Sequence, residues 1–66
     1  MNLTINGQPH ETLSAATVME LLEELRILSG RVAVEVNLNI VRKADYTKFR
    51  LHDGDTVEII NFVGGG

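Results

Sequence analysis

The 66-residue chain has no cysteine and no tryptophan, and aromatic residues make up only 5% of it. Without cysteine it cannot form a disulfide, a zinc–thiolate site or an iron–sulfur cluster, and it has no thiol nucleophile. The same absence suits a reducing compartment, so we expect a cytoplasmic protein. No apolar run approaches the roughly 20 residues of a membrane span, and the opening MNLTINGQ lacks a signal or transit pattern. The length is enough for one small domain.

Positive charge is also scarce, and the formal net charge is −3. This balance, with so few aromatic residues, argues against general nucleic-acid binding, and we expect neither a nucleic-acid nor a membrane partner. The acidic residues of the first half are Glu11, Glu20, Glu23 and Glu24. Most of the basic residues fall in one later segment, at Arg42, Lys43, Lys48 and Arg50. That segment is either a solvated polar surface or a docking patch for an acidic partner.

The first part of the chain reads as a β-hairpin. Apolar and polar residues alternate from Asn2 to Asn6, which predicts a strand with one buried face. Asn6-Gly7 is a strong hairpin signal because both residues tolerate positive φ. We expect the second strand over His10 to Ser14, with Pro9 at its start indicating an edge position.

A helix follows. Thr17 and Glu20 have capping-box spacing, with threonine at the N-cap and glutamate three residues later. Apolar residues then recur at helical spacing, at Val18, Leu21, Leu22, Leu25 and Leu28. Gly30 is the residue we expect to end this helix in the left-handed conformation.

The second half reads mainly as strands. Alternation over Val32 to Val36 predicts a third strand, followed by a turn at Asn37 to Asn39 and a short strand at Ile40-Val41. Asp53-Gly54-Asp55 is a turn leading into a last strand from Thr56 to about Phe62. In between, we expect Tyr46 and Phe49 to pack against the core. These elements make an α+β roll with the helix across one sheet face.

The last strand carries hydrophobic residues on both faces. Val57 and Ile59 share one face, while Ile60 and Phe62 share the other with polar Thr56 and Glu58. Either a bulge returns Ile60 and Phe62 to the core, or these two residues form an exposed contact patch.

No side chains have the spacing of a catalytic or metal site. His10 and His52 lack partners at ligand or triad spacing, and Asp53 and Asp55 are better explained as caps of their turn. The chain ends in NFVGGG, so the carboxylate of Gly66 is the remaining candidate group. Glycines without Cβ suit passage through a narrow channel. We therefore divide the chain into a domain at 1–63 and a flexible glycine tail at 64–66.

The whole chain resembles the ubiquitin-like β-grasp sulfur carriers, most closely those of thiamin biosynthesis, the ThiS type. The resemblance rests on the order and spacing of motifs: Asn6-Gly7, Thr17-Val18 with Leu21-Leu22-Glu23, Val32-Ala33-Val34 with Asn37, Asp53-Gly54-Asp55, and the final Gly65-Gly66. It implies a mixed four- to five-stranded sheet with one main helix across one face.

The resemblance also implies a carrier that is not itself an enzyme and binds no cofactor. A ThiF-type adenylating enzyme would use ATP and magnesium to activate the Gly66 carboxylate. Sulfur drawn from cysteine through a desulfurase would then convert it to a thiocarboxylate, which would supply sulfur to thiazole synthase (ThiG). Gly64 and Gly65 would give the tail access to partner active sites. Ile60, Phe62 and Val63 would belong to the docking surface.

Two positions depart from the pattern of these carriers. Leu38 follows Asn37 where glycine is common, and Arg42 follows Val41 where proline is common. We therefore expect Asn37 or Asn39 to take the left-handed conformation in this turn.

Three other functions remain open at this point. The small subunit of molybdopterin synthase uses the same terminal chemistry, although that family is usually longer. A ubiquitin-like modifier would share the activation step. A non-covalent RNA- or nucleotide-binding module of the same fold has only the basic segment from Arg42 to Arg50 in its favour.

Overall fold

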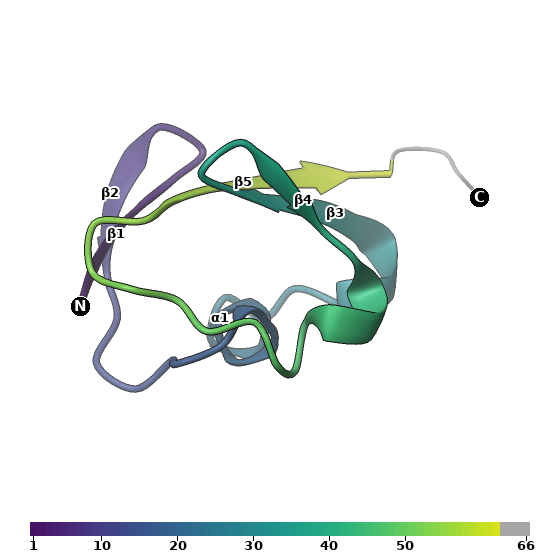
Figure 1. Cartoon of the computed structure of the whole chain (residues 1–66), viewed down its shortest axis with the longest axis horizontal. Coiled ribbons are helices and arrows are strands. Elements are labelled where there is room, and N and C mark those ends of the chain that lie inside the picture. Colours follow the sequence, from purple (N-terminus) through teal and green to yellow (C-terminus); the bar gives the residue numbers. More distant parts are fainter. Residues whose placement is uncertain (63–66) are drawn as a thin grey trace.

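A computed structural model of the chain describes residues 1–62. Its elements are, in order, β1 (Asn2–Ile5), β2 (Gln8–Glu11), α1 (Val18–Glu24), the 3₁₀ turn η1 (Ser29–Arg31), β3 (Val32–Val36), β4 (Asn39–Val41), the 3₁₀ turn η2 (Lys43–Asp45) and β5 (Thr56–Asn61). The strands form one mixed sheet in the order β2-β1-β5-β3-β4, and α1 lies across one face (Figure 1). This is the β-grasp architecture that the resemblance implied, with five strands. None of the described helices is long and apolar enough to cross a membrane.

The position of β5 decides the geometry of the sheet. The last strand is central, running parallel to β1 and antiparallel to β3. Polar side chains extend the contact with β1 beyond its end: Asn6 accepts from the Ile59 N–H at 2.7 Å and donates to the Ile59 carbonyl at 3.2 Å. The end of the strand therefore emerges from the middle of the sheet.

The first hairpin confirms the predicted turn and corrects the predicted strand. Asn6 and Gly7 have φ of +50° and +81°, as a two-residue primed turn requires. Such a short turn pairs Ile5 directly with Gln8, so β2 covers Gln8–Glu11 and the expected range of His10 to Ser14 is wrong. Pro9 lies inside this strand and is tolerated because β2 is at the sheet edge.

Helix α1 begins as predicted and ends early. The Thr17 and Glu20 side chains each bond to the other residue's backbone N–H, which completes the capping box. The predicted end at Gly30 is wrong, because Arg26 takes the left-handed conformation with φ of +60°. The Arg26 N–H bonds to the Glu23 carbonyl and the Ile27 N–H to the Leu22 carbonyl, both at 3.0 Å or less. This Schellman arrangement ends the helix.

The early end changes the roles of Leu28 and Gly30. Leu28 lies outside α1 and is 67% exposed, whereas Leu21 and Leu22 are buried. Gly30 falls within the 3₁₀ turn η1 instead of forming a C-cap. A left-handed arginine is unfavourable in isolation, which is why the spacing of glycines did not reveal this boundary.

The β3–β4 turn differs from the expectation at one residue. Val36 pairs with Asn39, leaving Asn37 and Leu38 as the two turn residues, with φ of +52° and +71°. Asn37 is left-handed as expected, but Asn39 belongs to β4 and Leu38 takes the second left-handed position. Asn37 also holds the turn against β5, since its amide bonds to the Thr56 N–H and to the Asp55 carboxylate.

The core lies between α1 and the inner sheet face. Its fully buried large side chains include Val18, Leu21, Leu22, Val32, Val34, Tyr46 and Val57. The predicted packing of Tyr46 and Phe49 is confirmed, although Phe49 is only partly buried. The Tyr46 hydroxyl donates to the Val32 carbonyl at 3.2 Å, and burial raises the pKa of this phenol. Within residues 1–62, every buried polar side-chain atom has a hydrogen-bond partner.

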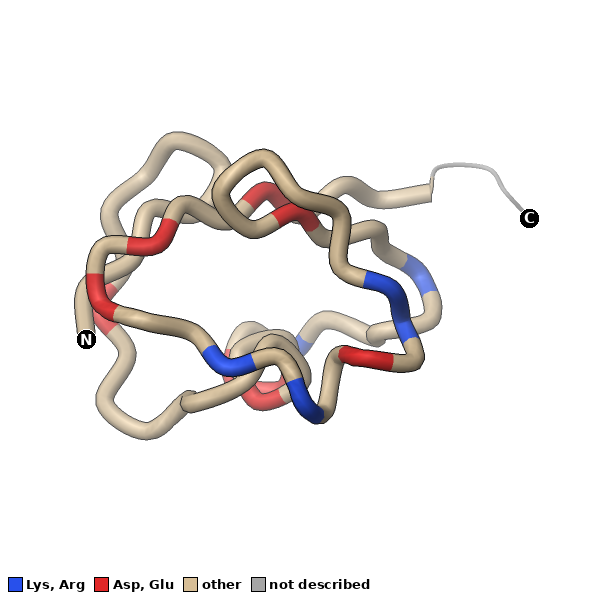
Figure 2. Tube along the Cα trace, in the orientation of Figure 1, with Lys and Arg blue, Asp and Glu red and all other residues tan. Residues whose placement is uncertain are grey.

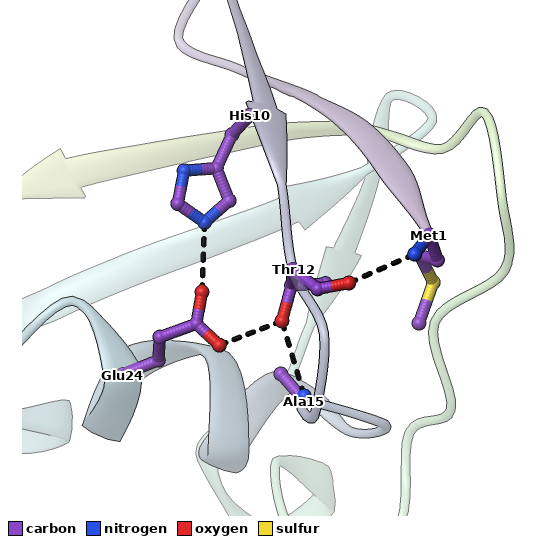
Figure 3. A network of polar contacts seen from close by, with 5 residues as sticks. All are labelled: Met1, His10, Thr12, Ala15 and Glu24. Carbon is purple, nitrogen blue, oxygen red and sulfur yellow. Dashed lines mark hydrogen bonds and ion pairs between the residues drawn. The ribbon is translucent and has the colours of Figure 1, made fainter.

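A polar network ties the edge strand to the end of the helix (Figure 3). Thr12 Oγ1 donates to Glu24 Oε1 at 2.6 Å, and His10 Nε2 lies 2.8 Å from Glu24 Oε2. The Ala15 N–H donates to the same threonine hydroxyl, and the Met1 ammonium donates to the Thr12 carbonyl. The bond from Thr12, followed by the contact with His10, lowers the pKa of Glu24 below its usual 4.5.

We predict that Leu38→Gly stabilises the protein by about 0.5–1 kcal/mol. The left-handed conformation costs a leucine about 1–2 kcal/mol, and glycine avoids this cost. The larger conformational entropy of glycine in the unfolded state cancels only part of that gain. No burial is lost, because Leu38 is 85% exposed. Urea denaturation measures the change. Leu13→Gly is the control, since Leu13 is 92% exposed and outside the left-handed region, and it should gain nothing. A loss of stability in Leu38→Gly would contradict this reading of the turn.

We predict that acid weakens the fold partly through Glu24. A carboxylate whose pKa is lowered by folding contributes stability above its unfolded pKa, and loses it as the pH falls through the folded value. Denaturation at a series of pH values from neutral to below 4.5 should therefore show a shallower decline for Glu24→Gln than for the wild type. Glu23→Gln, at an exposed neighbouring position, should keep the wild-type slope. Equal slopes in all three proteins would show that the network does not favour the ionised form.

Candidate functional site

The two faces of β5 separate as strict alternation predicts. Val57 and Ile59 point into the core with exposed fractions of 0% and 9%, while Ile60 and Phe62 are 49% and 55% exposed. The strand pairs continuously with β3 from Val36↔Val57 to Val32↔Asn61, so there is no bulge to return Ile60 to the core. The predicted alternative of a bulge is therefore wrong. Ile60 and Phe62 are exposed, and their role as a contact surface stays a prediction.

Neighbouring strands add to this surface. Ile40 is 76% exposed on β4 and lies opposite Glu35 of β3, which in turn lies opposite Glu58 of β5. In the next row, Ala33 lies opposite Ile60. We call the surface formed by Ile40, Ile60 and Phe62 the outer patch. The outer patch lies on the sheet face opposite α1. The alternate β3 residues Val32, Val34 and Val36 are buried on the helix side, so the residues between them and their cross-strand neighbours face away from the helix.

Phe62 is held in place by contacts that sequence reasoning did not identify. Its backbone N–H donates to the Arg31 carbonyl at 3.0 Å, and Lys43 Nζ lies 5.0 Å from the centroid of its ring. The same ammonium donates to the Gly30 carbonyl at 3.1 Å. A cation over an aromatic face is attracted by the ring quadrupole. Lys43 and Arg31 each lie about twenty residues or more before Phe62 in the sequence, so no local sequence signal indicates these contacts.

The other predicted site residues follow Phe62 in the sequence. Val63, Gly64, Gly65 and Gly66 fall outside the described residues, as does the expected boundary between the domain and the tail after residue 63. Of the predicted site residues, the structure therefore places Ile60 and Phe62, both on one exposed face.

The histidines and turn carboxylates have structural partners. His10 contacts Glu24, and the Asp55 carboxylate accepts from the His52 N–H at 2.8 Å. Asp53 accepts from the Asn2 N–H at 2.6 Å, so both aspartates cap backbone groups around the turn as expected. Among residues 1–62, no three or more acidic or histidine side chains gather as a metal site would require.

Comparison with known proteins identifies the family. The family model described as "ThiS family" matches residues 3–66. The chain belongs to the ThiS family. It is 40% identical to the sulfur carrier protein ThiS of Bacillus subtilis, over 97% of this chain and 98% of that protein. The crystal structure of a thiamine biosynthesis protein (ThiS) from Geobacter metallireducens superimposes with a TM-score of 0.86 at 38% identity, each chain being covered completely.

Longer proteins also contain a ThiS-like segment. The chain is 47% identical over its whole length to part of a thiazole synthase of Paramagnetospirillum magneticum, and 35% identical to part of one from Magnetococcus marinus. It spans only 20% of the length of each. A ThiS-like sequence thus occurs both as a small protein and within proteins named thiazole synthase.

We predict that aspartate is tolerated at one position of β5 and strongly destabilising at the adjacent one. Ile60→Asp should fold, with stability changed by no more than about 1 kcal/mol, because the carboxylate stays in water. Ile59→Asp should lose several kcal/mol or fail to fold, because it buries a charge. Thermal and urea denaturation of the pair measures this. Similar destabilisation of both variants would mean that Ile60 contributes to the core and that the outer patch is not available for docking.

Proposed function

We propose that this ThiS-family chain is a sulfur carrier of thiamin biosynthesis and not itself an enzyme. The observation that carries the proposal is its match along almost the full length of a protein named sulfur carrier protein ThiS, with the family model extending to Gly66. The absence of cysteine agrees with this role, because any sulfur carried by the chain must sit on a group other than a thiol.

The carried atom would be attached to the Gly66 carboxylate. A free carboxylate is a poor acyl donor, and a ThiF-type adenylating enzyme would join it to AMP from ATP, releasing pyrophosphate and using magnesium. A desulfurase would take the sulfur of cysteine as a persulfide, and a dithiol reductant, oxidised to its disulfide, would release that sulfur at the sulfide level. This sulfur nucleophile would attack the acyl carbon. The new C–S bond replaces the C–O bond to AMP, AMP leaves, and Gly66 ends as a thiocarboxylate.

The carrier would then deliver sulfur to thiazole synthase. The occurrence of a ThiS-like segment in two proteins named thiazole synthase supports this partner. Gly64 and Gly65 would let the chain enter narrow partner sites, since glycine has no Cβ. The chemistry calls for no cofactor resident on the carrier, because ATP and magnesium act in the partner.

The outer patch would be the docking surface for both partners. Ile60 and Phe62 are exposed, and Val63 follows them directly in the sequence. Apolar side chains gathered on an otherwise polar sheet face favour a protein contact. Residues 63–66 follow Phe62 directly in the sequence, so a contact at this patch would bring the tail of the carrier to the partner.

We predict a mass change localised to Gly66. The chain incubated with ATP, magnesium, sulfide and the adenylating enzyme from the same genome should gain the mass of one oxygen-to-sulfur exchange, seen by intact mass spectrometry. Fragmentation should place the change on Gly66, and a variant lacking Gly66 should stay unmodified.

A wild-type mass that stays unchanged, with an enzyme shown to be active on another carrier, would contradict the proposal. A mass gain that persists without Gly66 would place the sulfur on another residue and contradict the assignment of the carboxylate.

A further inference from the structure

The outer sheet face carries positive charge at the end where β5 finishes. Extending the pairing of Val32 with Asn61 by one residue makes Arg31 the cross-strand neighbour of Phe62, as their 3.0 Å backbone hydrogen bond shows. Alternation along β5 puts the Phe62 side chain on the outer face, and the exposed Arg31, the last residue of η1, lies beside it. Lys43 lies over the Phe62 ring, so its ammonium is held at the same end.

Arg42 adds a further cation to this end. It continues the extended backbone beyond β4, with φ of −72° and ψ of 147°, so alternation places its side chain on the same face as Ile40. Its 3.2 Å ion pair with Asp45 leaves the arginine side chain 80% exposed. A pair this exposed holds the guanidinium weakly, and the group stays free to meet a partner. We call Arg31, Arg42 and Lys43 the cationic end.

The same face carries negative charge one row further back. Glu35 and Glu58 lie directly opposite each other in the β3–β5 ladder. Like charges at such positions destabilise a sheet, and in residues 1–62 neither carboxylate forms an ion pair. The fold therefore gains nothing from placing these two residues together.

The separation of charge is local to this part of the sheet. In Figure 2, red segments lie in the middle of the sheet and blue segments lie on the side of the fold toward which β5 runs, while both colours also occur elsewhere along the chain. Ile60 lies between the two charged regions, while Ile40 lies in the same row as Glu35 and Glu58. The protein has a net charge of −3, so the cationic end is a local feature that contrasts with the rest of the surface.

We propose that this face is a polarised docking surface for the adenylating enzyme, which presents carboxylates to the cationic end and a basic group to Glu35 and Glu58. This inference rests on the proposed function and specifies the surface chemistry of its partner. Apolar contact alone would allow the sheet to dock in either direction. Opposite charges at the two ends of the patch favour one direction, the one that points residue 62 toward the partner's active site.

Matched charge reversals test the proposal. The double variant Arg31→Glu/Arg42→Glu changes the cationic end, and Lys48→Glu/Arg50→Glu makes the same change of net charge at exposed positions outside it. Binding to the cognate adenylating enzyme is measured by calorimetry at low and high salt. We expect the first double variant to bind at least about tenfold more weakly at low salt, with a smaller difference at high salt. The second should stay within about twofold of the wild type.

A single substitution provides an independent check that does not rely on a destabilised protein. Glu58→Lys removes the like-charge pair with Glu35, so it should raise the melting temperature while weakening binding. Glu11→Lys makes the same charge change at an exposed position on β2 and should leave binding unchanged. Higher stability combined with weaker binding is a result that a merely structural role for Glu58 would not give.

The outcomes separate this inference from the proposed function. Equal losses of affinity in the two double variants would mean that only the net charge affects binding. Unchanged affinity in both would mean that these charges do not contribute to binding. Either result overturns the polarised surface. If the wild type gains sulfur normally while either result is obtained, the carrier function stands. If the active enzyme neither binds nor modifies the wild type, the proposed function fails and this inference fails with it.

Discussion

The pairing of β5 between β1 and β3 is the constraint on which the rest of the structure depends. Because the last strand is central, Val57 and Ile59 must fill the core, and the alternate residues must face outward. The two hydrogen bonds between the Asn6 side chain and the Ile59 backbone extend the contact between β5 and the first hairpin toward the end of β5. The exposed Ile60 and Phe62 at the end of β5 are thus a consequence of strand order together with the two-residue side-chain period.

Much of this could be predicted because the signals are local. The capping box at Thr17 and the Asn6-Gly7 turn are each formed by residues no more than three positions apart in the sequence. Both are confirmed. Period-2 alternation gave the outward position of Ile60 and Phe62 as one of two alternatives, and the continuous ladder between β3 and β5 decides in its favour. The resemblance to the sulfur carriers added the fold and the family, which local patterns alone left open.

The features that could not be predicted depend on tertiary contacts. The early end of α1 uses a left-handed arginine, and the β3–β4 turn uses a left-handed leucine, both against local preference. In each case neighbouring contacts compensate: Ile27 bonds back to Leu22, and Asn37 is anchored to Thr56. The contact of Lys43 with Phe62 joins two segments 19 residues apart, and only folding brings them together.

The central strand also determines how the domain responds to tension. A partner that draws the chain forward past residue 62 pulls β5 along its own length. The ladders to β1 and β3 then resist together in shear, since sliding the strand requires many hydrogen bonds to break at once. An edge strand such as β4 would instead peel away bond by bond. We therefore expect tension applied along β5 to leave the sheet paired.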